Sequence, residues 1–187
     1  MSCTSQCLCP LSAHSERAAE RTFTHALQQA VSCVTPAVLS NWRDRSQPDD
    51  HLCSLLLNNG HPVSLAGTLR LYLTVTLRYR IVTDTADRGR WAIRTEQYIY
   101  SLRNEETDVL AYQWHPGLGQ RVTWPHLHIQ DPALQDSVFL SSRKHLITGY
   151  VALEEVLLLA IEEFDVQPRL ANWRQILEET RRAGAGA

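Results

Sequence analysis

The chain of 187 residues has a single lysine among its 18 basic residues, a single methionine and no long apolar run. Because a membrane-spanning helix needs about 20 largely apolar residues in succession, the sequence predicts none. The formal net charge is only -2, and 44% of the residues are hydrophobic. These values exclude a wholly disordered chain and argue against a protein that attracts nucleic acid over its whole surface. They favour a soluble globular protein with one domain.

The cysteines do not predict a disulfide framework. The chain has five cysteines, and three of them (Cys3, Cys7 and Cys9) crowd into the first nine residues. An odd number in this distribution is not typical of a secreted disulfide framework, and the spacing matches no usual structural zinc site. We predict a disordered tail over 1–14 and no bound cofactor or metal. With no sign of a signal peptide, we also predict a cytoplasmic location.

The first part of the predicted domain, over 15–60, has helical features. Small and apolar residues recur every three or four positions over 16–31, which predicts a helix with one apolar face. Thr35 followed by Pro36 is typical of a helix start, so we expect a short second helix that runs toward Trp42.

Alternation of apolar and polar residues marks the middle of the chain. In residues 69–82 the odd positions are apolar and most of the even positions are polar, as in a half-buried strand of an antiparallel sheet. Further strands are predicted at 91–102, 109–115 and 122–129, with polar or glycine-containing turns between them. The sequence therefore predicts a four-stranded antiparallel β-meander within 68–130.

Two helices are predicted at the end, within 149–182. Thr148 is a candidate cap for the first, and Asn172 is a candidate cap for the second, with Gln175 in capping-box position. The predicted fold is a single α+β domain over 15–182, with the meander packed against N- and C-terminal helices, and a frayed tail over 183–187.

The predicted fourth strand carries the densest chemistry, since His126 and His128 are separated by one residue. Alternation places both imidazoles on one face, about 7 Å apart along the strand, while Leu127 and Ile129 point toward the helices. His115 ends the third strand and meets the pair if the register allows. Such imidazoles suit metal ligation or acid–base catalysis near neutral pH, although they could also be ordinary polar residues on a solvated face.

Arginines follow the polar face of the first strand and could bind phosphate beside these histidines. An equally ordinary explanation is a solvated sheet face. The candidate substrate-binding residues are Arg78, Arg80, Tyr112, Trp124 and Lys144.

The order of motifs over 97–164 resembles the TumE-type toxins of prokaryotic toxin–antitoxin modules. The residues that carry the resemblance are YIYSL at 98–102, LAY at 110–112, the His-Pro loop at 115–116 and WPHLH at 124–128, before an apolar helix. The chain departs from the family in having Gln113 and Trp114 at acidic and amide positions, and one histidine fewer in the last motif. The resemblance implies a small α+β protein that acts on RNA or another host target and has a DNA-binding antitoxin partner.

A second motif, HLHIQ at 126–130, is similar to the His-x-His-x-Gln of the histidine-triad superfamily. In its hexose-phosphate uridylyltransferase branch the second histidine is the nucleophile, which would be His128 here. The predicted meander does not match the strand and helix that precede the motif in that fold.

The leading hypothesis is a toxin or defence-associated, metal-independent ribonuclease. His126 and His128 would act as base and acid, His115 would orient them, and the basic residues would hold phosphate. A metal-dependent version is an alternative. Another is a non-enzymatic interaction module that uses an open sheet face with Tyr112, Trp114 and Trp124. The sequence leaves the oligomeric state open.

Overall fold

The computed structural model describes residues 13–43, 52–84, 89–105, 107–117, 121–130 and 144–184. The predictions for the N-terminal tail, including Cys3, Cys7 and Cys9, lie outside the described residues, as does most of the loop predicted over 131–147. The described end of that loop contains a short strand, Leu146–Ile147, that the sequence did not predict.

Two long antiparallel strands, β4 (Tyr72–Thr83) and β5 (Trp91–Arg103), form the centre of the sheet. Along β4, buried and half-buried side chains alternate, with the buried set running from Leu73 to Ile81. The alternation predicted from the sequence is therefore confirmed. The buried side chains of β4 face the helices and form the core.

Within the described residues the sheet has eight strands, all antiparallel, rather than the four that the sequence predicted. The predicted meander is present as the four consecutive strands β4, β5, β6 (Asp108–Trp114) and β7 (His126–Ile129). The order across the sheet is β1-β2-β4-β5-β6-β7-β8, and β3 pairs with β4. The additional strands are β1 (Leu39–Arg43), β2 (Leu52–Leu57), β3 (Val63–Ser64) and β8 (Leu146–Ile147).

The short helix predicted from Pro36 toward Trp42 is wrong, because β1 occupies that place. The hydroxyl of Thr35 accepts the backbone N–H of Ala37, two residues on, which makes a turn instead of a helix cap. The side chain of Gln28 then bonds to the backbone of Ala37 and Leu39 and holds the chain against the first helix. Among the described residues of the stretch predicted as helical over 15–60, only α1 (Glu16–Ser32) is α-helical.

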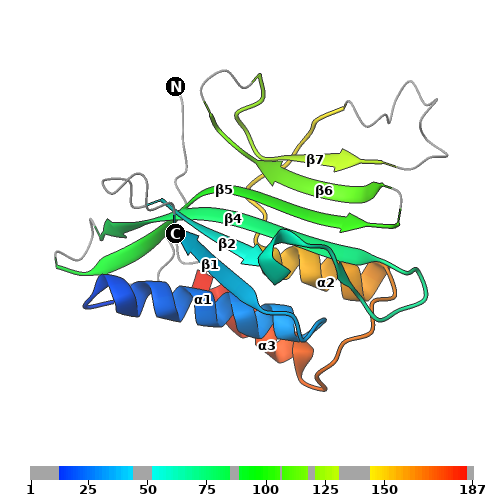
Figure 1. Cartoon of the computed structure of the whole chain (residues 1–187), viewed down its shortest axis with the longest axis horizontal. Helices are drawn as coiled ribbons and strands as arrows, with labels where there is room; N and C mark the ends of the chain where they lie inside the picture. Colours follow the sequence, from blue (N-terminus) through cyan, green and yellow to red (C-terminus); the bar gives the residue numbers. More distant parts are fainter. Residues whose placement is uncertain are drawn as a thin grey trace.

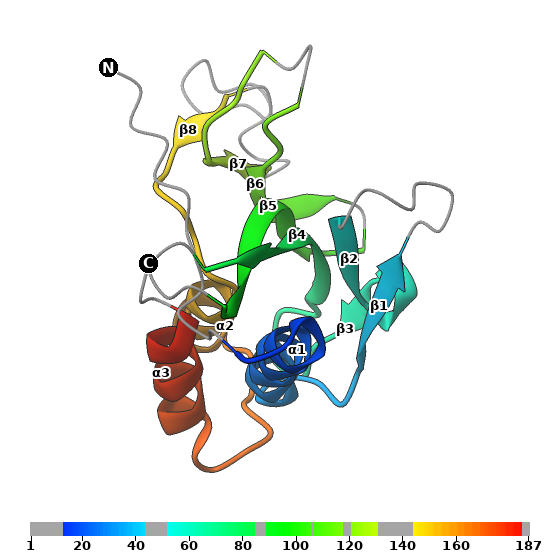
Figure 2. The same ribbon diagram turned by 90° about the vertical axis from the view of Figure 1, so that its left-hand side faces the viewer.

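Three helices, α1, α2 (Leu153–Glu163) and α3 (Trp173–Gly184), lie on one side of the sheet (Figures 1 and 2). Ser15 caps α1 through its side chain, and Phe23 of α1 packs edge-on against Tyr79 of β4 at 5.2 Å between ring centroids. None of the helices in the described ranges is long and apolar enough to cross a membrane. The coarse prediction of an α+β fold with helices on one face of the sheet is confirmed.

One of the two C-terminal helices begins at a different residue from the predicted cap. Ala152, not Thr148, precedes α2, and the Glu155 side chain accepts the backbone N–H of Ala152. α3 begins directly after Asn172, at the predicted place. Thr148 instead donates its backbone N–H to the carbonyl of Pro125, which ties the segment after β8 to the start of β7.

Gly67 lies where two backbone segments come into close contact, so we expect any side chain at this position to destabilise the fold. A Cβ added at Gly67 would sit 2.6 Å from the backbone oxygen of Asp165. We expect Gly67→Ala to lower the free energy of unfolding by about 1–3 kcal/mol. Urea denaturation checks this against Gly149→Ala, which meets nothing within 4 Å. Equal stability of the two variants would contradict the close approach.

A second prediction concerns Glu154, a buried carboxyl on α2. Burial raises its pKa above the usual 4.5, although the hydrogen bond with Thr180 opposes the rise. Because the folded state then holds this proton more tightly than the unfolded chain, stability falls as the pH rises above about 4.5. We expect Glu154→Gln to be more stable than wild type at pH 7, with the gain disappearing at pH 4.

The control is Glu163→Gln, an exposed change on the same helix, which should leave the free energy of unfolding unaltered at both pH values. A Glu154→Gln variant that is less stable than wild type at pH 7 would show that the carboxylate is stabilising there.

Candidate functional site

The register of β7 against β6 decides which face the histidines occupy. His126 is paired with Gln113 and His128 with Ala111, whereas Leu127 is paired with Tyr112. Directly paired residues share a face, and Tyr112 packs against the core beneath the helices. His126 and His128 therefore lie on the face away from the helices, as the alternation predicted.

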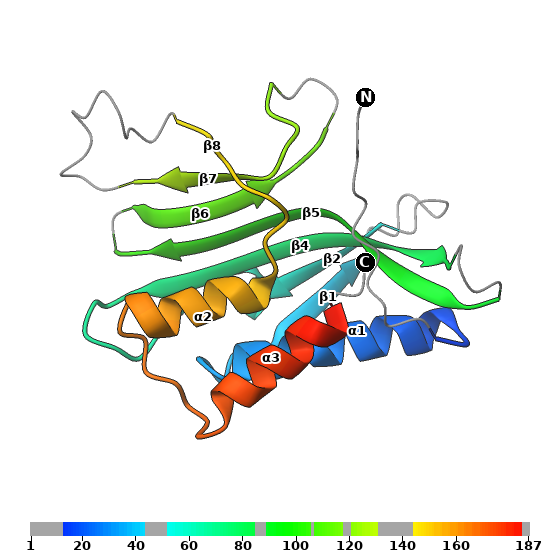
Figure 3. The same ribbon diagram turned by 180° about the vertical axis from the view of Figure 1, so that it is seen from behind.

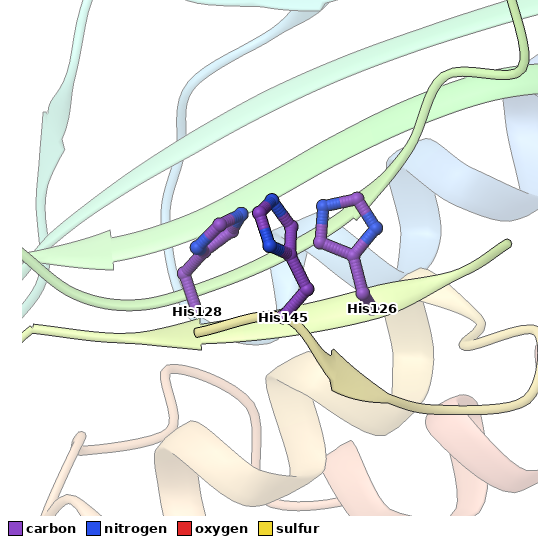
Figure 4. Close-up of side chains that lie close together, drawn as sticks. All are labelled: His126, His128 and His145. Carbon is purple, nitrogen blue, oxygen red and sulfur yellow. The ribbon is translucent and has the colours of Figure 1, made fainter. Parts of the chain in front are cut away.

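A third imidazole, from His145, completes a group that the sequence did not predict. β8 pairs with β7 so that Ile147 is opposite His126, and His145, two residues earlier, lies on the same face. Its ring centroid is 4.9 Å from that of His126 and 4.6 Å from that of His128. We call His126, His128 and His145 the histidine cluster. One ring nitrogen from each lies within 4.8 Å of the others (Figure 4).

His115 lies beside the cluster but contributes differently. Its ring centroid is 5.5 Å from that of His126, so the structure does bring it to the pair as the sequence analysis considered. Its Nε2 is 3.3 Å from the side-chain oxygen of Gln113, the residue paired with His126. Gln113 therefore orients His115 at the border of the cluster.

The imidazole of His126 is almost fully buried, with 1% of its surface exposed. Its Nδ1 lies 2.9 Å from the carbonyl oxygen of Trp124. Because a carbonyl can only accept, Nδ1 must carry the proton, and the neutral ring then presents a lone pair at Nε2. This Nε2 is buried without a hydrogen-bond partner. Figure 4 shows it on the side of the ring that faces His145.

The pKa of His126 is lowered, chiefly because burial disfavours the charged ring. The hydrogen bond to the Trp124 carbonyl opposes this, while the neighbouring imidazoles of His128, His145 and His115 lower the pKa further. Near neutral pH the ring is therefore uncharged, and its Nε2 lone pair is available to a ligand.

The arginines proposed to bind phosphate lie on the same face as the cluster but on β4. At about 4.8 Å per strand, β4 is about 14 Å from β7, so the arginines flank the cluster without contacting it. Arg78 donates to the Gln97 side chain at 3.3 Å. Arg80 and Arg94 both pair with Glu96, at 3.4 and 2.8 Å, which offsets part of their charge.

The other predicted substrate-binding residues are divided between the two faces. Tyr112 is half-buried on the helix side, and so is Trp114, which contacts Tyr98 at 6.0 Å. Trp124 is 42% exposed just before β7, and Lys144 is exposed next to His145. The open aromatic face considered from the sequence therefore loses two of its three members.

Comparison with protein-family models, with curated proteins and with solved structures finds no significant match to this chain. The candidate site is therefore interpreted from its own residues.

The burial of an imidazole with an unpartnered nitrogen predicts that His126 is not present for stability. Replacing it by leucine, which has a similar volume and no polar atoms, should change the free energy of unfolding by less than about 1.5 kcal/mol in metal-free buffer. His126→Ala leaves a cavity and should be the less stable of the two. Thermal or urea denaturation measures both. A large loss in His126→Leu would show that the imidazole is a structural residue.

Proposed function

We propose that the protein cleaves RNA phosphodiester bonds at the histidine cluster. The observation that carries the proposal is the meeting of three imidazoles, two from β7 and one from the residue before β8, on the sheet face that also bears Arg78 and Arg80. Imidazoles act in proton transfer near neutral pH, and guanidinium groups bind phosphate. An extended strand of RNA laid across β4 to β7 would bring both kinds of group to one substrate.

The reaction follows from the chemistry of RNA. A base at the cluster accepts the proton of the 2′-hydroxyl, and the 2′-oxygen bonds to phosphorus as the bond to the 5′-oxygen breaks. The leaving 5′-oxygen takes up a proton. The products are a 2′,3′-cyclic phosphate and a 5′-hydroxyl, so no water is consumed in this step.

The three histidines of the cluster differ in their exposure to solvent. His145 is exposed and His128 is half-buried, so these two rings line the side that RNA would approach. The Nε2 of His126 is buried and its Nδ1 is bonded to Trp124, so neither nitrogen can contact RNA in this arrangement. The hypothesis that His126 is itself the acid or base is therefore less favoured than a role within the cluster.

The resemblance to TumE-type toxins supplies a biological setting for this activity. In that setting the protein is a toxin or defence-associated ribonuclease, and a DNA-binding antitoxin is its partner. The support for this setting is the set of motifs over 97–164, which includes the strand that carries His126 and His128.

A second candidate function is binding of a partner protein without catalysis. It is favoured by exposed apolar side chains around β8 and the start of β7, where Ile147 is 75% exposed and Trp124 is 42% exposed. Such side chains are typical of interfaces when they gather on one surface. In this case, loss of Trp124 would matter more than loss of an imidazole.

We expect purified wild-type protein to cleave RNA and His128→Ala and His145→Ala to cleave it at least about 100-fold more slowly. The assay follows a fluorescent oligoribonucleotide and identifies the cyclic phosphate at the new end. His61→Ala, an exposed histidine outside the cluster, is the matched control and should cleave like wild type.

Full activity in His128→Ala would contradict the proposed function. No cleavage by wild type, together with loss of a captured partner in Trp124→Ala but not in His128→Gln, would favour the binding surface instead.

A further inference from the structure

We propose that the histidine cluster binds one divalent transition-metal ion of the zinc class. This inference rests on the same site as the proposed function and states what that site holds. The three ring nitrogens lie within 4.8 Å of one another. Zinc–nitrogen bonds of about 2.0–2.1 Å in a tetrahedron require nitrogens about 3.3 Å apart, so binding would draw the rings closer together around the ion.

The buried Nε2 of His126 is independent support for an ion. A buried polar atom without a partner destabilises a fold by about 1–3 kcal/mol unless something satisfies it. The hydrogen bond between Nδ1 and the Trp124 carbonyl leaves the Nε2 lone pair on the cluster side of the ring. Metal-bound histidines commonly donate their other ring N–H to a carbonyl in this way. An ion among the three rings would satisfy this nitrogen.

The backbone holds the three donors in a way that suits a single ion. His126 and His128 belong to β7, and His145 directly precedes β8, the strand that pairs with β7. The backbone N–H of Thr148 donates to the carbonyl of Pro125 at 3.0 Å, which holds the β8 segment against the residue before His126. Sheet pairing thus fixes His126 and His128 and places the start of β8, directly after His145, beside them.

The donor set indicates the class of metal. Three neutral imidazoles, with no thiolate or carboxylate in the group, suit zinc or a similar transition metal. Calcium and magnesium prefer oxygen ligands and would bind poorly here. Three protein ligands also leave one coordination position open, as in catalytic rather than structural zinc sites. With the three imidazoles as ligands, the ion would supply the base for the 2′-hydroxyl proton by lowering the pKa of a bound water to about 7, in place of a free imidazole.

The experiment measures zinc binding in protein first stripped with EDTA. Because Cys3, Cys7 and Cys9 could themselves bind zinc, all proteins carry serine at these three positions. Isothermal titration with Zn²⁺ should give one ion per chain for this background. His126→Leu, His128→Ala and His145→Ala should each weaken binding at least about 10-fold, whereas His61→Ala should bind like the background.

The His126→Leu variant separates loss of a metal ligand from loss of the fold. Its side chain fills a similar space, and circular dichroism verifies that the variant is folded. Absence of stoichiometric binding in the background protein would overturn the inference. Binding that survives unchanged in the folded cluster variants would overturn it as well, since the ion would then lie elsewhere.

A parallel RNA cleavage assay separates this inference from the proposed function. Zinc binding lost in the cluster variants, without RNA cleavage by any protein, would support the metal site and contradict the ribonuclease. Cleavage that persists in EDTA, in a protein that binds no zinc, would support a metal-free histidine ribonuclease and contradict the metal site.

Discussion

The pairing of β7 between β6 and β8 is the constraint on which the candidate site depends. It sets His126 opposite Gln113 on one side and opposite Ile147 on the other. Because side chains alternate, a slip of one residue would turn both β7 imidazoles toward the helix side and bring Leu127 to the open face. The apolar positions of β7 oppose such a slip, since their partners on β6, Leu110 among them, lie on the helix side. The position of the imidazoles is therefore a consequence of apolar burial on the opposite face.

The segment that follows β8 reinforces this arrangement. Figure 3 shows it crossing the helix side of β6 and β5 before it enters α2. Tyr150 in this segment packs edge-on against Tyr98 and Trp114, and the Val151 N–H donates to the Tyr98 hydroxyl at 3.1 Å. Contacts on the core side thus hold β8 at the sheet edge, and β8 carries His145 to the open face. Within the cluster His145 is exposed, His128 is half-buried and His126 is buried, so access to the site is through His145 and His128.

Local pattern explains what the sequence could predict. The alternation of β4 and the helical spacing of α1 are properties of neighbouring residues, and both predictions are confirmed. The shared face of His126 and His128 follows from strand geometry in the same way. His145 could not be predicted, because it follows His128 by seventeen positions and joins it only through the pairing of β8 with β7. β1 was mistaken for a helix because Thr35 and Pro36 suit a turn as well as a cap.

X-ray absorption at the zinc edge measures whether the three imidazoles converge on one ion. The measurement uses zinc-loaded protein that lacks the N-terminal cysteines. We expect three imidazole nitrogens at about 2.0–2.1 Å from the ion, falling to two in His145→Ala. A first shell without imidazole scattering, or one that is identical in His145→Ala, would contradict it.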